Sequence, residues 1–224
     1  MTHQKRFAAT KRTALPRKGT KYLTAVCPGP HMRAEALSVN ALLRDTLTIT
    51  TSTRETKQLL HAGAVHINGV VRKDHKFPVG FLDEVSFDGI ADQYTLIYNT
   101  LGKLEAQKSK KGVRALKIMG KKAVQKGKIQ INLFTGVNIL LDKDKNYSVG
   151  DSVVVEKQKV TKHLKFEKGA HVFLTAGKHV GHQGVVEEIK KTESWTQPNI
   201  IVVKTKEGTF ETSQDYAYVV DGAI

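Results

Sequence analysis

The sequence predicts an α+β fold that is mainly β. Apolar residues have helical spacing over only two stretches, about 32–45 and 52–62, whereas short strand candidates separated by Gly, Asn and Asp fill most of the chain after them. The chain has 224 residues, of which 40% are hydrophobic, an ordinary value for folded protein. This length allows one large domain or two to three small ones, each with a modest core.

The first 31 residues are predicted to form an extended basic arm. They contain Pro16, Gly19 and a CPGP sequence at 27–30, without a periodic apolar pattern, and the first acidic residue of the chain is Glu35. Such an arm repels itself and gains little from folding alone, but it releases counterions when it neutralises phosphates. We therefore expect it to order on binding. Its candidate contacts are Lys5, Arg6, Lys11, Arg12 and Arg17.

Two helices are predicted next. The first covers about 32–45, where Ala36, Leu37 and Ala41 have roughly helical spacing. The second begins with a capping-box pattern from Ser52 to Glu55 and ends at Gly63.

Three basic residues of the second helix are expected to share one face. Arg54, Lys57 and His61 are spaced i, i+3 and i+7, on a different face from the apolar Leu59 and Leu60. The helix is therefore predicted to bury one side and to present positive charge on another.

A hairpin and a series of strands follow. Asn68-Gly69 lies between AVHI and VVR, and this pair favours a type I′ turn because both central residues need positive φ. Further strand candidates are DEVSF, YTLIYN, GKIQINLF, VNILLD and DSVVVE. From Phe166 onward, five short strands over some 55 residues predict a small, strongly bent barrel: Ala170–Leu174, Val185–Ile189, NIIVVKT, GTFETS and AYVV.

The charge balance indicates a polyanionic partner. Lys and Arg number 36 against 21 Asp and Glu, a net charge of +15 with a pI near 9.8. Residues 1–34 carry +8 and residues 103–128 carry +9, so the rest of the chain is at −2. A membrane surface is the competing polyanion. Cys27 as the only cysteine, a polar N-terminus without a signal-peptide core and the lack of any long apolar run predict a cytosolic protein.

The catalytic and metal patterns are weak. Gly177, Gly181 and Gly184 do not match a dinucleotide or P-loop spacing, so they are expected to allow a tight crossing of strands. His163, His171, His179 and His182 lack cysteine partners and a zinc-type spacing. Asp83 and Glu84 are neighbours on a strand and should point to opposite faces, and Asp142 and Asp144 lie in a predicted turn. We expect no enzyme, no metal and no cofactor.

The corner formed by the second helix and the hairpin is the most informative feature. Its basic residues fall just outside the apolar positions, and arginine forks suit phosphate oxygens of RNA, which is read by shape, phosphate and 2′-hydroxyl contacts. His61, His66 and His75 are either part of this RNA face or simply solvated. The plainer alternative is an α+β core with exposed charges. The candidate contacts are Arg33, Arg44, Arg54, Lys57, His61, Arg72 and Lys73.

Several segments resemble one known family. GPHMRAEALSVNALLRD, KQLLHAGAVHINGVVRKDHKFPVGFLDEVSF and YTLIYNTLGK are similar to the archaeal and eukaryotic form of small-subunit ribosomal protein four, which is distinct from bacterial protein four. The resemblance continues through GDSVVVE to LTAGKHVGHQGVV, which looks like a KOW motif, and it covers nearly the whole chain.

The resemblance implies a basic arm (1–31), a helix-pair and hairpin RNA-binding module with the start of a central sheet (32–100), a central β domain (101–162) and a KOW barrel of SH3-like fold (163–224). It also implies binding to the 5′ domain of small-subunit ribosomal RNA, contact with neighbouring ribosomal proteins, a place in the cytoplasmic ribosome, and neither catalytic residues nor a small-molecule substrate. The basic start of the family arm is matched by His3, Lys5 and Arg6.

The chain departs from the family pattern at two places. Lys21-Tyr22 stands where relatives tend to carry a Trp, and the chain ends at Ile224 without the basic tail of eukaryotic members, which favours an archaeal source.

Two other functions compete with a structural ribosomal protein. One is an RNA-modifying enzyme that uses the module for targeting, although residues 90–160 offer no catalytic constellation. The other is a transcription factor that uses the KOW barrel to contact polymerase.

Overall fold

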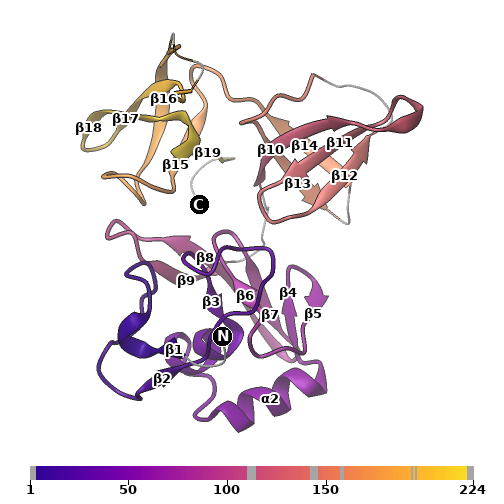
Figure 1. Cartoon of the computed structure of the whole chain (residues 1–224), viewed down its shortest axis with the longest axis vertical. Coiled ribbons are helices and arrows are strands. Elements are labelled where there is room, and N and C mark those ends of the chain that lie inside the picture. The colour runs from indigo at the N-terminus through magenta and orange to yellow at the C-terminus, as the bar shows by residue number, and fades with distance from the viewer. Residues whose placement is uncertain are drawn as a thin grey trace. The chain divides into compact units, whose positions relative to one another are not determined.

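The chain divides into two compact units, residues 1–112 and 113–224. The computed structural model describes residues 4–109, 115–141, 146–156, 159–192, 194 and 196–220 (Figure 1). Strands dominate both units and helices are few, which confirms the prediction of a mainly β protein. Within the described ranges, the named strands pair antiparallel.

The first unit is built on a five-stranded sheet. In spatial order its strands are β5 (Val70–Val71), β4 (Val65–Ile67), β7 (Glu84–Phe87), β8 (Ile90–Tyr98) and β9 (Leu104–Ser109). Two small ribbons accompany it, β1 (Gln4–Lys5) with β2 (Tyr22–Leu23) and β3 (Leu37–Ser38) with β6 (Pro78–Val79). Leu43, Leu60, Val65, Val85 and Leu96 are fully buried in its core. Each such aliphatic side chain contributes about 1.5–3 kcal/mol on burial.

The predicted helix over 32–45 is wrong in its first half. Helical structure begins only with α1 (Val39–Ala41), which continues as the π-helical turn η2 (Leu42–Thr46). Leu37 and Ser38 pair with β6 instead, and the Ser38 hydroxyl caps α1 by accepting from the Ala41 N–H at 3.3 Å. Residues 36–43 are all buried, so apolar spacing in this stretch does not distinguish strand from helix.

The second helix follows the prediction closely. In α2 (Thr53–Ala62) the Ser52 hydroxyl accepts from the Glu55 N–H at 3.3 Å. The Glu55 carboxylate reaches back one residue further than a capping box requires and accepts from the N–H and the hydroxyl of Thr51, bonds that lower the pKa of Glu55. Gly63 ends the helix with φ +81°.

The Asn68-Gly69 turn is also confirmed. Both residues have positive φ, 56° and 75°, as a type I′ hairpin requires. The turn is fixed from the side by Asp83, whose buried carboxylate accepts from Asn68 Nδ2 at 2.7 Å. The same carboxylate bonds His31 Nε2 at 2.7 Å and the Gly80 N–H at 2.9 Å. This Asp83 network joins the hairpin turn to the chain that precedes the first helix.

The arm is packed onto the first unit rather than free. Arg6, in the 3₁₀ turn η1 (Arg6–Ala8), is buried and donates to the carbonyls of Pro16 and Thr20, to the Thr20 hydroxyl and to Asp45 Oδ1 at 3.1 Å. Further along, Thr13 bridges Leu104, and the Leu104 N–H donates to the Arg12 carbonyl at 2.7 Å. The expectation that the arm orders only on binding is therefore wrong from Gln4 onward.

The second unit contains two five-stranded sheets. The first has the spatial order β12 (Asn138–Leu141), β11 (Ile129–Leu133), β10 (Ala115–Ala123), β13 (Ser152–Glu156) and β14 (Lys159–Leu164). The second has the order β18 (Gly208–Ser213), β17 (Ile200–Thr205), β16 (Gln183–Lys190), β15 (His171–Leu174) and β19 (Ala217–Val219). Short 3₁₀ turns, η3 (Gln125–Gly127) and η4 (Gln214–Tyr216), connect strands. The five strands of the second sheet are those predicted from the sequence.

Buried polar contacts link these two sheets. The Tyr218 hydroxyl of β19 accepts from the Lys117 N–H at 2.7 Å and donates to the Ala115 carbonyl at 2.9 Å. The Lys117 ammonium donates to the carbonyls of Asp215 and Ala217, both at 2.9 Å, and its burial lowers the pKa of this lysine. Residues on either side of the expected boundary at 162 thus pack directly against each other.

Candidate nucleic-acid interface

Helix α2 presents the predicted basic face. Arg54, Lys57 and His61 are exposed, whereas Thr56 and Leu60 on the other side are fully buried. The caps described above fix the ends of the helix, and Leu60 fixes its rotation, so the three basic side chains emerge from a rigid element.

The loop after the hairpin lies beside this face. The pKa of His75 is lowered, chiefly by partial burial and then by the positive charges of Lys57, Lys76 and His61, while Asp74 opposes the effect. The backbone of the loop is anchored, because the N–H groups of Asn40 and Val39 donate to the carbonyls of His75 and Phe77, both at 3.0 Å. We call Lys57, His61, His75 and Lys76 the helix–loop patch. Lys76 was not among the residues predicted from the sequence, although it ends the basic run RKDHK.

Arg72 and Lys73 begin the same loop. The Arg72 guanidinium lies over the Phe77 ring, 4.4 Å from its centroid, in a cation–π contact. Its Nε is buried without a hydrogen-bond partner among the described residues. Lys73 is exposed. Both residues extend the positive surface beside the helix–loop patch.

Two of the predicted arginines are instead committed to contacts inside the protein. Arg44 donates to both carboxylate oxygens of Asp45, at 3.3 and 3.0 Å, and to the Thr53 hydroxyl at 3.1 Å. Arg6 shares the same carboxylate, and the exposed fraction is only 19% for the Arg44 side chain and 4% for the Arg6 side chain. Asp45 therefore ties the arm to the end of the first helical segment.

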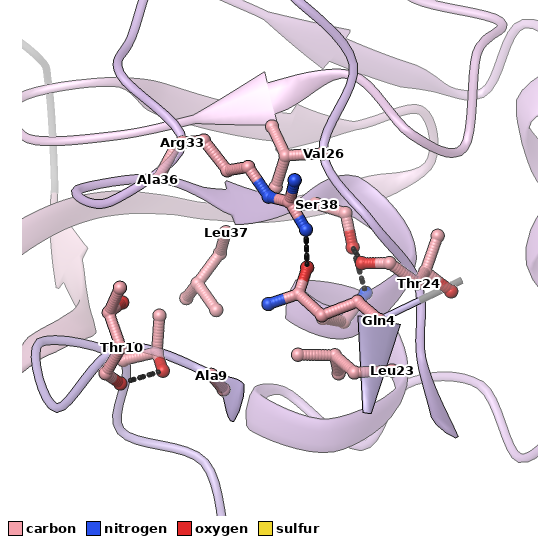
Figure 2. Close-up of a pocket in the computed structure, with 12 residues that line it drawn as sticks. Gln4, Ala9, Thr10, Leu23, Thr24, Val26, Arg33, Ala36, Leu37 and Ser38 are labelled. Atoms are coloured by element: carbon pink, nitrogen blue, oxygen red, sulfur yellow. Dashed lines mark hydrogen bonds between the residues drawn. The ribbon is translucent and has the colours of Figure 1, made fainter. Parts of the chain in front are cut away.

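The remaining arm residues are distributed differently. Lys5, Lys11 and Arg17 are exposed, whereas Arg12 forms an ion pair with Glu35. Arg33 is exposed and donates to Gln4 Oε1 at 3.3 Å (Figure 2). The cavity under Arg33, lined by residues that include Leu23, Ala36 and Leu37, measures only about 10 Å³. It has room for one water molecule at most and is no ligand site.

The lysine-rich segment 103–128 contributes two strands that the sequence did not predict, β9 and β10. Lys121, Lys122 and Lys128 are exposed, Lys117 is buried, and Lys108 is paired with Asp92. His3, Lys110, Lys111 and Arg114 lie outside the described residues.

The described part of the chain offers no arrangement for acid–base or metal chemistry. Asp83 is sequestered in its network, His163 bonds the buried Asp151 at 2.8 Å, and His179 stacks on Phe210 with ring centroids 3.8 Å apart. Within the described ranges, no group of three or more His, Cys, Asp or Glu is placed to hold a metal ion. Asp142 and Asp144 lie outside those ranges. Among the same residues, no helix has the length and apolar character needed to cross a bilayer.

The glycine loop is structural, as expected. A Cβ on Gly184 would lie 2.5 Å from the carbonyl oxygen of Lys204 on the paired strand β17, so only glycine permits this close crossing. Gly177 and Gly181 have positive φ, 89° and 83°.

Three comparisons identify what the chain is similar to. A model described as "Ribosomal family S4e" matches residues 90–160. The protein named "Small ribosomal subunit protein eS4" from Archaeoglobus fulgidus is 37% identical over 221 residues, covering 97% of this chain and 92% of the relative. Its namesake from Methanosphaera stadtmanae is 35% identical, with coverages of 97% and 91%. The crystal structure of the 30S ribosomal protein S4e from Thermoplasma acidophilum has a TM-score of 0.69 at 28% identity, covering 83% of this chain and 95% of that one.

Proposed function

The chain belongs to ribosomal family S4e, and from that premise we propose that it is a structural constituent of the small ribosomal subunit, in the cytoplasm, that binds 5′-domain ribosomal RNA and supports assembly and translation. The family is one of ribosomal structural proteins, which confirms the prediction that the chain is not an enzyme. Its partners are small-subunit ribosomal RNA and neighbouring ribosomal proteins.

The proposal assigns a role to each part of the chain. The arm (1–31) and the module (32–100) hold the RNA, residues 101–162 form the central β domain, and the strands of 163–224 form a KOW barrel of SH3-like fold. The packing of Lys117 against Asp215 and Ala217 supports a joint action of the last two parts.

The helix–loop patch is the observation that carries the proposal. Lys57, His61 and Lys76 form no ion pair with a described residue, and a capped helix and an anchored loop hold them in place. Because the backbone that carries these side chains is already ordered, binding a fixed pattern of phosphates costs side-chain freedom but no ordering of the backbone. An anionic surface of matching contour, such as folded RNA, is the partner that this geometry fits.

The ion pairs of the described residues support a division of the twelve predicted contacts into two proposed roles. We propose that Lys5, Lys11, Arg17, Arg33, Arg54, Lys57, His61, Arg72 and Lys73 contact RNA directly. Arg6, Arg12 and Arg44 are held by carboxylates, and we propose that they position the arm and the first helical segment for those contacts.

The salt dependence of RNA binding tests the proposal. If about six phosphates are neutralised, log K should fall with log salt at a slope near −5, from a rule of about −0.9 per duplex contact. In the Arg54→Glu, Lys57→Glu variant, two lost contacts should make the slope about 1.8 shallower. The assay is filter binding of the full chain to a 5′-domain ribosomal RNA transcript.

A matched control removes the same charge elsewhere. Lys165→Glu with Lys190→Glu changes two lysines that already pair with Glu167 and Glu211, so RNA binding should stay near that of the unaltered chain. A wild-type slope shallower than about −2 contradicts the proposal. So does failure of the protein to sediment with small subunits at moderate salt.

A further inference from the structure

We propose that a basic pocket between the arm and the β8–β9 turn holds a single unpaired nucleotide of the RNA, with its base against leucine side chains and its phosphate on lysine and arginine. The pocket has a volume of about 490 Å³. It is lined in part by Leu15, Leu101, Lys11, Arg17 and Lys103. This inference rests on the proposed function and adds a nucleotide-sized site to it.

The walls of the pocket are built in advance. On one side, Asn99 Oδ1 accepts from the N–H groups of Leu101 and Lys103, at 3.0 and 2.9 Å, and the Asn99 N–H donates to the Lys103 carbonyl at 2.9 Å. On the other side, Arg6 fastens the arm through its four hydrogen bonds, and the bridge from Thr13 to Leu104 joins the arm to the start of β9. A ligand therefore meets an ordered site.

The charge of the pocket is uniformly positive. Lys11, Arg17 and Lys103 are exposed, and none of them forms an ion pair with a described residue. Nearby carboxylates are engaged elsewhere, because Glu35 pairs with Arg12 and Glu105 accepts from Asn99 Nδ2. An anion is the ligand that this electrostatic environment selects.

The apolar part of the pocket indicates that the anion carries an apolar group. Leu101 is 76% exposed at the rim, a large apolar surface that water covers unless a ligand packs on it. The volume lies within the roughly 300–1,000 Å³ of small-ligand sites, more than a phosphate ion alone requires. A nucleotide combines both features, and proteins read single-stranded RNA by accepting splayed-out bases.

Photocrosslinking from the pocket tests this assignment. In the full chain, p-benzoylphenylalanine at position 101 should crosslink to one unpaired nucleotide of the 5′-domain transcript, mapped as a single reverse-transcription stop. Lys11→Gln with Lys103→Gln should abolish that stop and make the salt slope about 0.7 shallower, because the phosphate of one nucleotide is one single-strand contact. The control, Lys165→Gln with Lys190→Gln, should leave both readouts unchanged.

Several outcomes overturn the inference. Crosslinks spread along a duplex, or an unchanged stop and slope in the Lys11→Gln, Lys103→Gln variant, contradict a nucleotide site. If the chain gives no crosslink to RNA but millimolar AMP occupies the pocket, the pocket is a site for free nucleotides instead. If the transcript binds and responds to changes at Arg54 and Lys57 but not at Lys11 and Lys103, only the pocket assignment fails. If the transcript does not bind at all, the proposed function fails first.

Discussion

Removing the Asp83 carboxylate should destabilise the first unit severely. Asp83 has no exposed surface, and at least three donors converge on it, His31 Nε2 at 2.7 Å, Asn68 Nδ2 at 2.7 Å and the Gly80 N–H at 2.9 Å. In an Asp83→Ala variant His31 and the Gly80 N–H lose their acceptor in a buried space, and the half-buried Asn68 amide loses its acceptor too. The hairpin turn then also loses its lateral support.

The expected loss follows from the number of bonds. Hydrogen bonds to a charged group contribute about 1.5–3 kcal/mol each, so even with partial relaxation three of them give a loss of at least about 4 kcal/mol. Whole domains are stable by only about 5–15 kcal/mol. With a urea m-value of about 2 kcal/mol per M, the unfolding midpoint of the first unit should fall by about 2 M.

The assay must follow the two units separately, because a chain with two compact units need not unfold in one step. Hydrogen exchange read by mass spectrometry across a urea series resolves peptides from residues 4–109 and 115–220. Asp88→Ala is the matched control, since Asp88 is exposed and lies 3.5 Å from His66, and such surface pairs contribute about 0–1 kcal/mol. Equal midpoints for Asp83→Ala and Asp88→Ala in the first unit would refute the reasoning.

Three further outcomes are expected. Tyr218→Phe leaves the Lys117 N–H and the Ala115 carbonyl unpaired and should cost the second unit about 2–4 kcal/mol in urea unfolding, with Tyr216→Phe, an exposed site, as the control. Gly184→Ala should destabilise the same unit, because the added Cβ would meet the Lys204 carbonyl oxygen. The control is Gly208→Ala, which is strained by its φ of +145° but whose Cβ meets no atom. Equal decreases in the thermal unfolding midpoint for the two variants would contradict the close-crossing argument. RNA affinity should rise as pH falls through and below 6.5, because the free protein holds the pKa of His75 below 6.5 and nearby phosphates raise it, so the complex binds more protons. The His75→Gln variant should show a flatter pH profile in filter binding. An unchanged profile would show that His75 is remote from RNA.

The features that depend on neighbouring residues in the chain were predicted correctly from the sequence. The Ser52 cap, the Gly63 stop and the Asn68-Gly69 turn depend on residues next to each other in the chain, and each occurs in the structure. Strand β10 was missed because lysines interrupt its apolar pattern, yet Leu116, Lys117 and Ile118 are all buried. Strands β9 and β14 are likewise rich in polar residues at their edges of the sheets.

The fate of individual cations could not be predicted from the sequence. Arg6 meets Asp45 across 39 positions, and Arg12 meets Glu35 across 23. No periodicity reports such distant pairing, so counting arginines overstates the surface available to a partner. The face of α2, in contrast, followed from helical spacing alone.

The docking of the arm through Arg6 has a thermodynamic consequence. A segment that is already ordered brings no large folding transition to the encounter, so association should lack the strongly negative heat-capacity change that accompanies coupled folding. The rate of encounter is then set by electrostatic steering and by orientation rather than by a search through arm conformations. Calorimetric titrations should therefore give the heat-capacity change expected for the association of two rigid surfaces.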